Sequence, residues 1–354
     1  MNLILNKIKS QIQHNLPFVV FCKPNSKQLI AMFQRDATLQ ILDENSIAGF
    51  AFVSFDGFKK ILIPEINSDL YFENLDDTPK LLSKLIEANP DAVAKSDFEK
   101  LVQFAIKSIE NESLKKVVVS RKQLLQISNF NIETTLKKLF ASSTNTFRYL
   151  FFHPEVGMWM GASPERLLSI QNQILKSVSL AGTQVCHKNE RVIWQQKEQD
   201  EQQIVTDFLQ QKFEKLGSNL KISEAYTQQA GNLIHLKTDL QVQISNDNSI
   251  FEITNLLHPT PAVCGYPTET ARDFILKNEN YNREFYSGYC GEWKKNFGTY
   301  SDNETDLYVN LRCMKIEHKS ATFFAGCGVT VGSNPEKEFL ETQNKMQTMK
   351  SVLF

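Results

Sequence analysis

Three charged residues near the C-terminus are spaced so that a helix would present them together. Glu338, Glu341 and Lys345 follow a glycine-rich, β-branched stretch and Pro335, a residue that helices accept in their first turn. Their spacing, i, i+3 and i+7, places them on one helix face. Two carboxylates and an ammonium beside a glycine-lined strand could hold a divalent cation and an anionic small molecule. A solvated helix face has the same pattern, so this segment alone does not decide between the two.

A second acidic segment repeats the pattern. Glu198 and Glu201 share a face in the stretch 192–216, for which we expect a helix. Two helices that each present a glutamate pair could place oxygen ligands around one hard cation. Mg²⁺ suits such a site because it takes few protein carboxylates and keeps waters or an anionic substrate as its other ligands. The sequence therefore predicts a magnesium site.

Two other residues are candidates for proton transfer. Lys116 precedes the apolar stretch 117–119, and a lysine held in apolar surroundings loses its proton more easily and can act as a base. Glu165 follows a sharp turn and could serve as a general acid. Taken singly, these patterns more often describe a solvated lysine at a strand edge and an ordinary polar turn. His235 lies in an apolar run and fits a hydrogen-bonded core histidine at least as well as a ligand, and the proline-rich loop 258–267 suits either a site wall or a structural crossover.

The elements that must position these residues follow from periodicity and turn signals. We expect strands at 18–22, 29–33, 49–55, 60–63, 117–120, 147–152, 157–161, 165–170, 178–181, 222–227 and 233–244, and a hairpin of 306–316 with 321–331. We expect helices at 1–9, at 96–111, from a cap at Asn131 to 142, at 192–216, and after Pro335 with Ser333 or Asn334 as its cap. Residues 66–95 are the least patterned. This alternation predicts an α+β fold of stacked, largely antiparallel sheets with helices packed outside.

Composition narrows the class of protein. The 354 residues carry a net charge of −1, which gives no electrostatic case for nucleic acid or an anionic membrane as a partner. No apolar run approaches the ~18 to 20 residues needed to span a bilayer, and the N-terminus lacks the order of a signal peptide. The six cysteines are scattered without a Cys-x-x-Cys pair, which is typical of reduced thiols in a cytoplasmic protein.

Several short motifs occur in a fixed order along the chain. They are Lys-Val-Val-x-Ser-Arg at 116–121, Gly-Ala-Ser-Pro-Glu at 161–165, Leu-Ala-Gly-Thr at 180–183, the pair Glu198 and Glu201, His-Pro-Thr-Pro-Ala at 258–262, Arg-Glu-Phe-Tyr-Ser-Gly at 283–288, Leu-Arg-Cys at 311–313, and Ala-Gly-x-Gly before the last helix. This ordered set closely resembles the chorismate-utilising enzymes, the family of anthranilate synthase component I, and within it the isochorismate synthases. The resemblance covers about 96–354, so we expect one continuous catalytic region there and a motif-free sheet portion at 1–95.

The resemblance implies a role for each candidate residue. Lys116 would activate water for attack at C2 of chorismate, and Glu165 would protonate the departing C4 hydroxyl. Water is a poor nucleophile and hydroxide a poor leaving group, so a base and an acid on opposite sides of the ring are what the chemistry needs. Glu201 and Glu341 match the direct Mg²⁺ ligands, and Glu198 and Glu338 match carboxylates that act through water. The substrate-binding positions would be Gly182, Thr183, His235, Ala262, Tyr286, Arg312, Gly326, Gly328 and Lys345.

Alternatives within the family remain open at this point. The loop 258–262 resembles isochorismate synthases more than amine-adding members, and Lys116 argues against aminodeoxychorismate synthases. Tyr286, where several isochorismate synthases have phenylalanine, leaves room for a salicylate synthase. A catalytically silent chorismate-binding subunit would have lost some of these acids and bases, and this chain keeps them.

Two features of the chain depart from the pattern or are not set by it. Gln202 stands where the family commonly has histidine, which puts the support of the neighbouring metal ligand in question. We expect a monomer, and the sequence does not distinguish menaquinone from siderophore biosynthesis.

Overall fold

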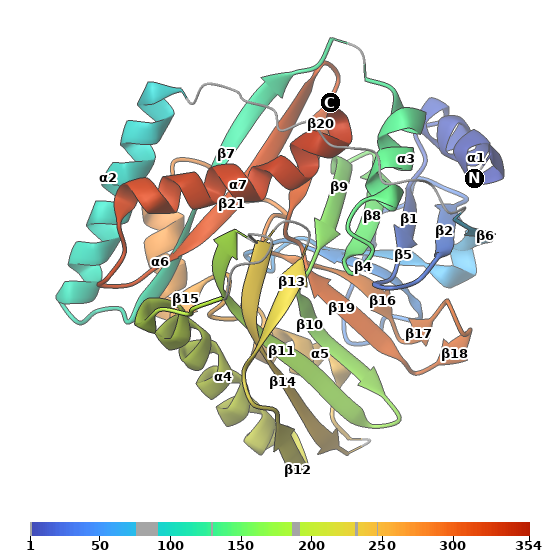
Figure 1. Ribbon diagram of the computed structural model, residues 1–354. Helices are drawn as coiled ribbons and strands as arrows, with labels where there is room; N and C mark the ends of the chain where they lie inside the picture. The colour runs from blue at the N-terminus through green and yellow to red at the C-terminus, as the bar shows by residue number, and fades with distance from the viewer. Residues whose placement is uncertain (1, 76–90, 129, 186–191, 231–232, 246) are drawn as a thin grey trace.

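Two antiparallel sheets stack on each other and helices cover their outer faces (Figure 1). The computed structural model describes residues 2–75, 91–128, 130–185, 192–230, 233–245 and 247–354. Within these residues the first sheet has nine strands in the order β15-β7-β21-β20-β9-β8-β1-β2-β6, and the second has ten in the order β12-β14-β11-β10-β19-β16-β4-β5-β3. The expected α+β fold of stacked antiparallel sheets is confirmed.

The strand bounds follow the order of each sheet. The first sheet consists of β15 (Gly265–Tyr266), β7 (Lys116–Gln126), β21 (Ser320–Val329), β20 (Cys313–Glu317), β9 (Gly157–Ser163), β8 (Phe147–His153), β1 (Phe18–Cys22), β2 (Gln28–Gln34) and β6 (Ser68–Asn74). The second consists of β12 (Gly217–Ile222), β14 (Leu233–Ile244), β11 (Ile174–Val185), β10 (Arg166–Gln171), β19 (Thr305–Val309), β16 (Tyr289–Trp293), β4 (Gly49–Val53), β5 (Lys60–Pro64) and β3 (Gln40–Ile41), with β13 (Tyr226–Ala230) also paired to β14. A small ribbon joins β17 (Lys295–Asn296) and β18 (Ser301–Asp302).

The helices begin where the sequence offers caps. They are α1 (Asn2–Gln13), α2 (Ala92–Glu110), α3 (Ile132–Ala141), α4 (Gln196–Leu216), α5 (Ile250–Leu257), α6 (Thr268–Asn278) and α7 (Pro335–Leu353), with a 3₁₀ turn at Glu65–Asn67. Asn131 caps α3, as expected, by accepting a hydrogen bond from the Thr134 amide. Asn334, of the two candidates, caps α7 by accepting from the Lys337 amide. The helices that carry the two glutamate pairs are therefore α4 and α7.

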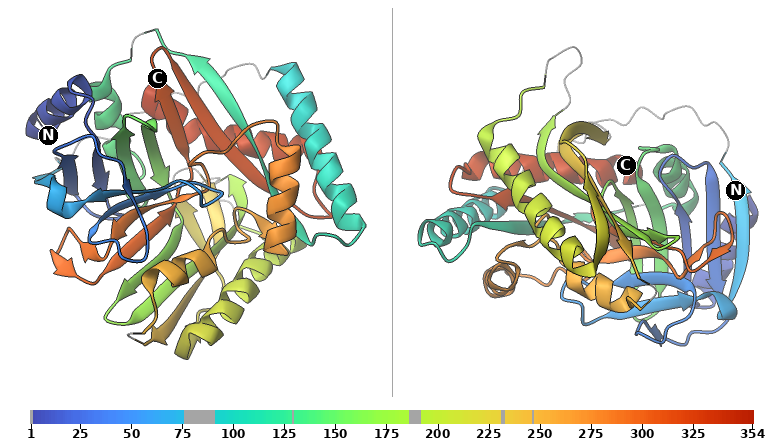
Figure 2. Two further views of the ribbon diagram at one scale, coloured as in Figure 1. Left: turned by 180° about the vertical axis from the view of Figure 1, so that it is seen from behind. Right: turned by 90° about the horizontal axis from the view of Figure 1, so that it is seen from below.

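The helices that matter for the site lie on different sheets. Helix α7 crosses the outer face of β21 and contacts α2 and α3, whereas α4 packs on β11 and β14 of the second sheet (Figure 1). In the view from behind, α5 and α6 lie on the side that faces the viewer (Figure 2, left). The first turns of α4 and α7 approach each other where the two sheets meet, because an ion pair joins Lys197 of α4 to Glu338 of α7.

Aromatic side chains fill the space between the sheets. The Phe52 ring of β4 stacks on Phe151 of β8 at a centroid distance of 4.1 Å, and Phe147 of β8 stacks on Tyr308 of β19 at 4.3 Å. All four rings are buried. Burial of large aromatic surfaces is a strong stabilising contribution, and here it fixes the separation of the two sheets.

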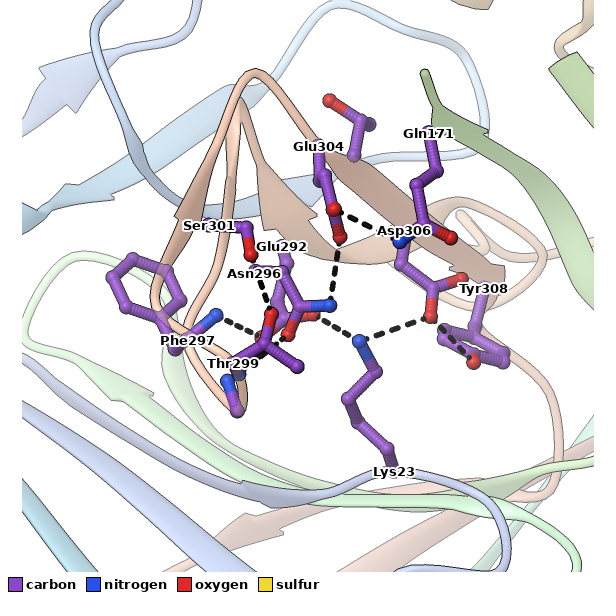
Figure 3. A network of polar contacts seen from close by, with 12 residues as sticks. Lys23, Gln171, Glu292, Asn296, Phe297, Thr299, Ser301, Glu304, Asp306 and Tyr308 are labelled. Carbon is purple, nitrogen blue, oxygen red and sulfur yellow. Dashed lines mark hydrogen bonds and ion pairs between the residues drawn. The ribbon is translucent and has the colours of Figure 1, made fainter. Parts of the chain in front are cut away.

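An ion cluster also joins the sheets (Figure 3). Lys23, directly after β1 of the first sheet, lies with its Nζ 2.6 Å from Glu292 Oε2 and 3.3 Å from Asp306 Oδ2, both in the second sheet. Asp306 also pairs with the guanidinium of Arg166, whose Nε is 2.8 Å away. Because Glu292 is 1% exposed, removing a cation from this cluster would leave a buried charge without compensation.

Most of the expected elements are present, and three differ. The prediction of one continuous strand at 306–316 is wrong. Strand β19 ends at Val309 in the second sheet, and the chain crosses to the first sheet before β20 begins at Cys313. The strand expected at 222–227 divides into β12 and β13, which pair with different parts of β14. The weakly patterned region 66–95 contains β6 and the start of α2, and residues 76–90 lie outside the described part of the chain.

The N-terminal strands are integrated into both sheets. Strand β1 pairs with β8, and β4 pairs with β16. Of the six cysteines, the five within the described residues are free and buried, and Cys186 lies outside them. No helix in the described part of the chain is long and apolar enough to cross a membrane.

Candidate functional site

Two of the candidate residues lie where the chain crosses between the sheets. Glu165 follows β9 and precedes β10, and Arg312 follows β19 and precedes β20. The two crossings are hydrogen-bonded side by side, since the Val309 amide donates to the Glu165 carbonyl and the Ala162 amide to the Arg312 carbonyl, each at 3.0 Å. Arg312 has a φ of 46°, a left-handed conformation that costs a non-glycine residue energy and is held here by the crossing.

Glycine at 328 makes room for the charged groups opposite it. Gly328 on β21 pairs with Val118 on β7, two residues beyond Lys116. A Cβ at Gly328 would lie 2.5 Å from Glu201 Oε2 and 3.0 Å from Lys116 Cε. Those distances are too short for a side chain, so the absence of one lets Lys116 and Glu201 approach each other over this strand.

Lys116 begins a line of buried charges that runs from β7 to α7. Its Nζ lies 3.8 Å from Glu201 Oε2, and Lys116 is 1% exposed. Glu201 Oε1 lies 3.6 Å from the Nζ of Lys197, one turn earlier on α4. Lys197 in turn forms an ion pair and a hydrogen bond with the buried Glu338 of α7. Charges of alternating sign therefore connect the base candidate to both acidic helices.

A second ion pair, Glu341 with Lys345, lies further along α7. Lys345 Nζ lies 2.6 Å from Glu341 Oε1 and donates a hydrogen bond of 2.9 Å to the Gly326 carbonyl. The last helix is thereby tied to the middle of β21. Tyr286 stacks on Phe324 at a centroid distance of 5.6 Å, and its hydroxyl lies 3.0 Å from where a Cβ on Gly326 would be.

These residues surround one cavity, with about 670 Å³ of atom-free space that includes open solvent. Of the residues predicted from sequence, twelve line it: Lys116, Glu165, Gly182, Glu201, His235, Ala262, Tyr286, Arg312, Gly326, Gly328, Glu341 and Lys345. The structure thus brings together side chains from both sheets and both acidic helices.

Three predicted residues do not line the cavity. Glu198 forms the capping box of α4, accepting from the Gln195 amide at 2.7 Å, and also accepts from Gln184 Nε2 at 3.1 Å. Glu338 is buried and is paired with Lys197, which does not line the cavity either. Thr183 pairs with His235 in the β11–β14 ladder, and its side chain is outside the described part.

The sequence analysis did not identify two cations near the site, the partly exposed Lys197 and the buried Arg283. Lys197 is four residues before Glu201, a spacing that marks an ion pair on a helix and could have identified it. Arg283 donates to the carbonyls of Val118 (2.6 Å) and Val263 (3.0 Å) and is paired with Glu279. It therefore fastens the strand of Lys116 to the proline-rich loop, a long-range contact that no local pattern reveals.

Burial shifts the protonation of the acid and base candidates in opposite directions. Desolvation lowers the pKa of the Lys116 ammonium, although Glu201 and Glu165 oppose it, and raises the pKa of Glu165 to about 8. Burial likewise raises the pKa of Glu201 to about 7 and lowers that of His235 to about 3, so the imidazole is neutral near pH 7. At neutral pH Glu165 thus carries a proton, and burial favours the neutral form of Lys116.

The carboxylates fit a cation with few protein ligands. Among the described residues, no three His, Cys, Asp or Glu side chains form a ready-made metal cluster. Mg²⁺ does not require one, because it keeps several waters and binds through one or two carboxylates. A cation already lies between two of these carboxylates, since the Lys197 ammonium contacts both Glu201 and Glu338. The donor set therefore suits a hard divalent ion.

Gln202 follows Glu201, one of the glutamates expected to bind a metal, but its side-chain amide donates to two threonines. Its Nε2 donates to Thr206 Oγ1 at 2.9 Å and to Thr238 Oγ1 at 2.6 Å. These bonds fasten α4 to β14. Gln202 therefore holds in place the helix that carries Glu201, and the Glu201 carboxylate itself is contacted by Lys116 and Lys197.

Comparisons with known proteins point to one family. The family model described as "Chorismate binding enzyme" matches residues 59–354. The chain is 28% identical over 267 residues to isochorismate synthase EntC of Escherichia coli (strain K12), covering 72% of this chain and 66% of that protein. It is 30% identical over 277 residues to isochorismate synthase MenF of Bacillus subtilis (strain 168), covering 75% and 57%. The matches thus span about two thirds or less of these relatives' own lengths.

A solved structure shares the fold. The menaquinone-specific isochorismate synthase MenF from Escherichia coli superposes with a TM-score of 0.77 at 20% identity, covering 96% of this chain and 89% of that one. The arrangement of two stacked sheets with helices outside is therefore that of a solved chorismate-utilising enzyme.

The raised pKa of Glu165 is directly measurable. We expect one carboxyl group to titrate near pH 8 in carbon-13 NMR of protein labelled at the glutamate side-chain carboxyl carbon, because burial disfavours its ionised form. This titration should be absent from Glu165→Gln and retained in Glu155→Gln, a change in the β8–β9 turn at the opposite end of β9. A wild-type spectrum in which every glutamate ionises below about pH 6 would contradict the assignment.

Proposed function

The chain belongs to the chorismate-binding enzymes, and on that basis we propose that it is an isochorismate synthase, an isomerase that converts chorismate reversibly to isochorismate. The observation that carries the proposal is the pair Lys116 and Glu165. Both are buried in the wall of one cavity, and burial favours the neutral form of each, an acceptor and a donor of one proton. The activity of the relatives named above supports the same assignment.

The two residues divide the chemistry of hydroxyl transposition. Lys116 Nζ takes a proton from water as its oxygen attacks C2, and Glu165 gives its proton to the C4 hydroxyl as that group leaves as water. One water enters and one leaves, so the atoms balance. After the step Lys116 holds a proton and Glu165 lacks one, which is the arrangement that the reverse reaction needs. Reversibility then follows from the symmetry of the acid–base pair.

The cationic groups bind the two carboxylates of chorismate. The planar fork of Arg312 suits a carboxylate in a bidentate arrangement, and Lys345 adds a second cation to the wall of the same cavity. The backbone at Gly182, Gly326 and Gly328 lines the cavity, and together with that at Thr183 it would bind the carboxylates and the hydroxyl of chorismate. His235, neutral at pH 7, can exchange hydrogen bonds without adding charge.

Mg²⁺ fits the carboxylates between the helices. In this proposal Glu201 and Glu341 are its direct ligands, and Glu198 and Glu338 act through water. When bound, Mg²⁺ neutralises the ring carboxylate of chorismate and orients it. The protein's part is to hold these carboxylates on two rigid helices.

The product test is incubation with chorismate and Mg²⁺ followed by chromatography. We expect a mixture of chorismate and isochorismate that approaches the same ratio from either side, because the bonds made and broken are alike. A lactate dehydrogenase assay should detect no pyruvate at a rate comparable to isomerisation. Stoichiometric pyruvate release would indicate a salicylate synthase and make Tyr286 the first residue to replace. No turnover of chorismate would overturn the proposal.

Replacement of the base should separate chemistry from binding. We expect Lys116→Ala to lower kcat by about 10²- to 10⁴-fold, the range of a general base, and to change the affinity for chorismate much less. The matched control is Lys115→Ala, which removes the adjacent exposed lysine and should leave both constants near wild type. Near-normal turnover of Lys116→Ala would contradict the role of Lys116.

A further inference from the structure

Six charged side chains beside the cavity, three carboxylates and three lysines, nearly cancel one another's charge without a metal ion. Each of the three carboxylates Glu201, Glu338 and Glu341 lies within ion-pair distance of a lysine. Three lysines supply these contacts: Lys116, Lys197 and Lys345. When Lys116 is protonated, the charges of the six side chains sum to zero, and when Lys116 is in the neutral form that accepts a proton from water they sum to −1. In either state a divalent cation that enters alone leaves the largely buried cluster with a net positive charge, which is unfavourable unless one ammonium moves away.

Of the three lysines, Lys197 is the one that can leave. The Nζ of Lys345 is anchored by a hydrogen bond to the Gly326 carbonyl, and Lys116 is enclosed with 1% of its side chain exposed. The Lys197 side chain is 26% exposed and begins in the first turn of α4, so its ammonium can swing into solvent by side-chain rotation. Within the described part of the chain, its ion-pair partners are Glu201 and Glu338.

Lys197 also lies where the cation's charge is needed. It contacts one glutamate from each acidic helix, Glu201 of α4 and Glu338 of α7, and so joins the two helices as a metal would. Within the described residues, the second oxygen of Glu338, Oε2, is buried and accepts no hydrogen bond. The Lys197 ammonium thus leaves one oxygen of the buried Glu338 without a partner, and a divalent ion with its waters would compensate this carboxylate better.

We propose that Lys197 is a built-in counter-ion that holds Glu201 and Glu338 together in the metal-free protein and competes with Mg²⁺ for them. The inference rests on the proposed function for the identity of the cation. Its consequence is a lowered affinity for Mg²⁺ alone. Chorismate carries two negative charges, so metal and substrate together add no net charge, and Lys197 thereby makes metal binding favourable mainly when the dianionic substrate is present.

The test is Mg²⁺ binding to the full-length protein without chorismate, measured by isothermal titration calorimetry. We expect Lys197→Gln to bind Mg²⁺ at least tenfold more tightly than wild type, because the competing charge is gone. Lys215→Gln, an exposed lysine at the other end of α4, should bind within about twofold of wild type. Unchanged or weaker binding by Lys197→Gln overturns the proposal.

The melting temperature gives a second readout, which remains interpretable even if the substitution destabilises the protein, because the change caused by Mg²⁺ is measured for each protein separately. Lys197→Gln should melt at a lower temperature than wild type without metal, because Glu338 loses its counter-ion, and Mg²⁺ should raise its melting temperature more than that of wild type. An equal Mg²⁺-induced shift in the two proteins overturns the proposal. If wild type turns over chorismate while these metal measurements fail, only the role of Lys197 is lost; if wild type neither binds Mg²⁺ nor turns over chorismate, the proposed function fails with it.

Discussion

The contact between the buried amino group of Lys116 and the buried carboxyl group of Glu201 constrains the rest of the site. Neither group could be enclosed alone, since an isolated ion in a protein interior costs several kcal/mol. Gly328 leaves the space that the pair occupies, because a Cβ there would lie 2.5 Å from Glu201 Oε2 and 3.0 Å from Lys116 Cε and would force these groups to move. The pair also requires α4 to pack at one position on β11 and β14, which the Gln202 bonds to Thr206 and Thr238 secure. The geometry of a proton-transfer site is thus set by the cost of burying charge.

The stacking of the two sheets brings Glu165 to the same cavity as Lys116. Glu165 and Arg312 belong to two crossings that run side by side between the sheets, each hydrogen-bonded to the other. Stacked aromatic rings and the Lys23 cluster hold the sheets at the spacing those crossings need. The base lies on one sheet and the acid at the junction with the other. A change in sheet separation would therefore alter the distance between proton donor and acceptor.

Much of the fold and most of the site could be predicted from sequence, for physical reasons that are local. The capped helix at α7, the strand 233–244 and the i, i+3, i+7 spacing of Glu338, Glu341 and Lys345 depend on neighbouring residues alone. The break between β19 and β20 could not be predicted in this way, because the apolar pattern continues across it and the left-handed Arg312 is imposed by the other crossing.

The roles of Glu198 and Lys197 show a further limit of sequence patterns. Two glutamates share a face of α4, yet Glu198 caps its own helix while Glu201 reaches the cavity, and periodicity does not distinguish them. The partner of Lys197 on α7 is 141 residues away in sequence. Contacts of this kind depend on the packing of two helices from different sheets, and so only the assembled structure reveals them.

The central claim is that solvent water, activated on the side of Lys116, supplies the new hydroxyl while the old one leaves past Glu165. Incubation of chorismate and Mg²⁺ with the enzyme in oxygen-18 water, stopped well before equilibrium, tests this directly by mass spectrometry of the isochorismate. The account predicts one oxygen-18 atom per molecule of isochorismate, located in the C2 hydroxyl. Isochorismate that carries only the original, unlabelled oxygen would mean that the hydroxyl migrates within the substrate, and it would contradict the assigned roles of both residues.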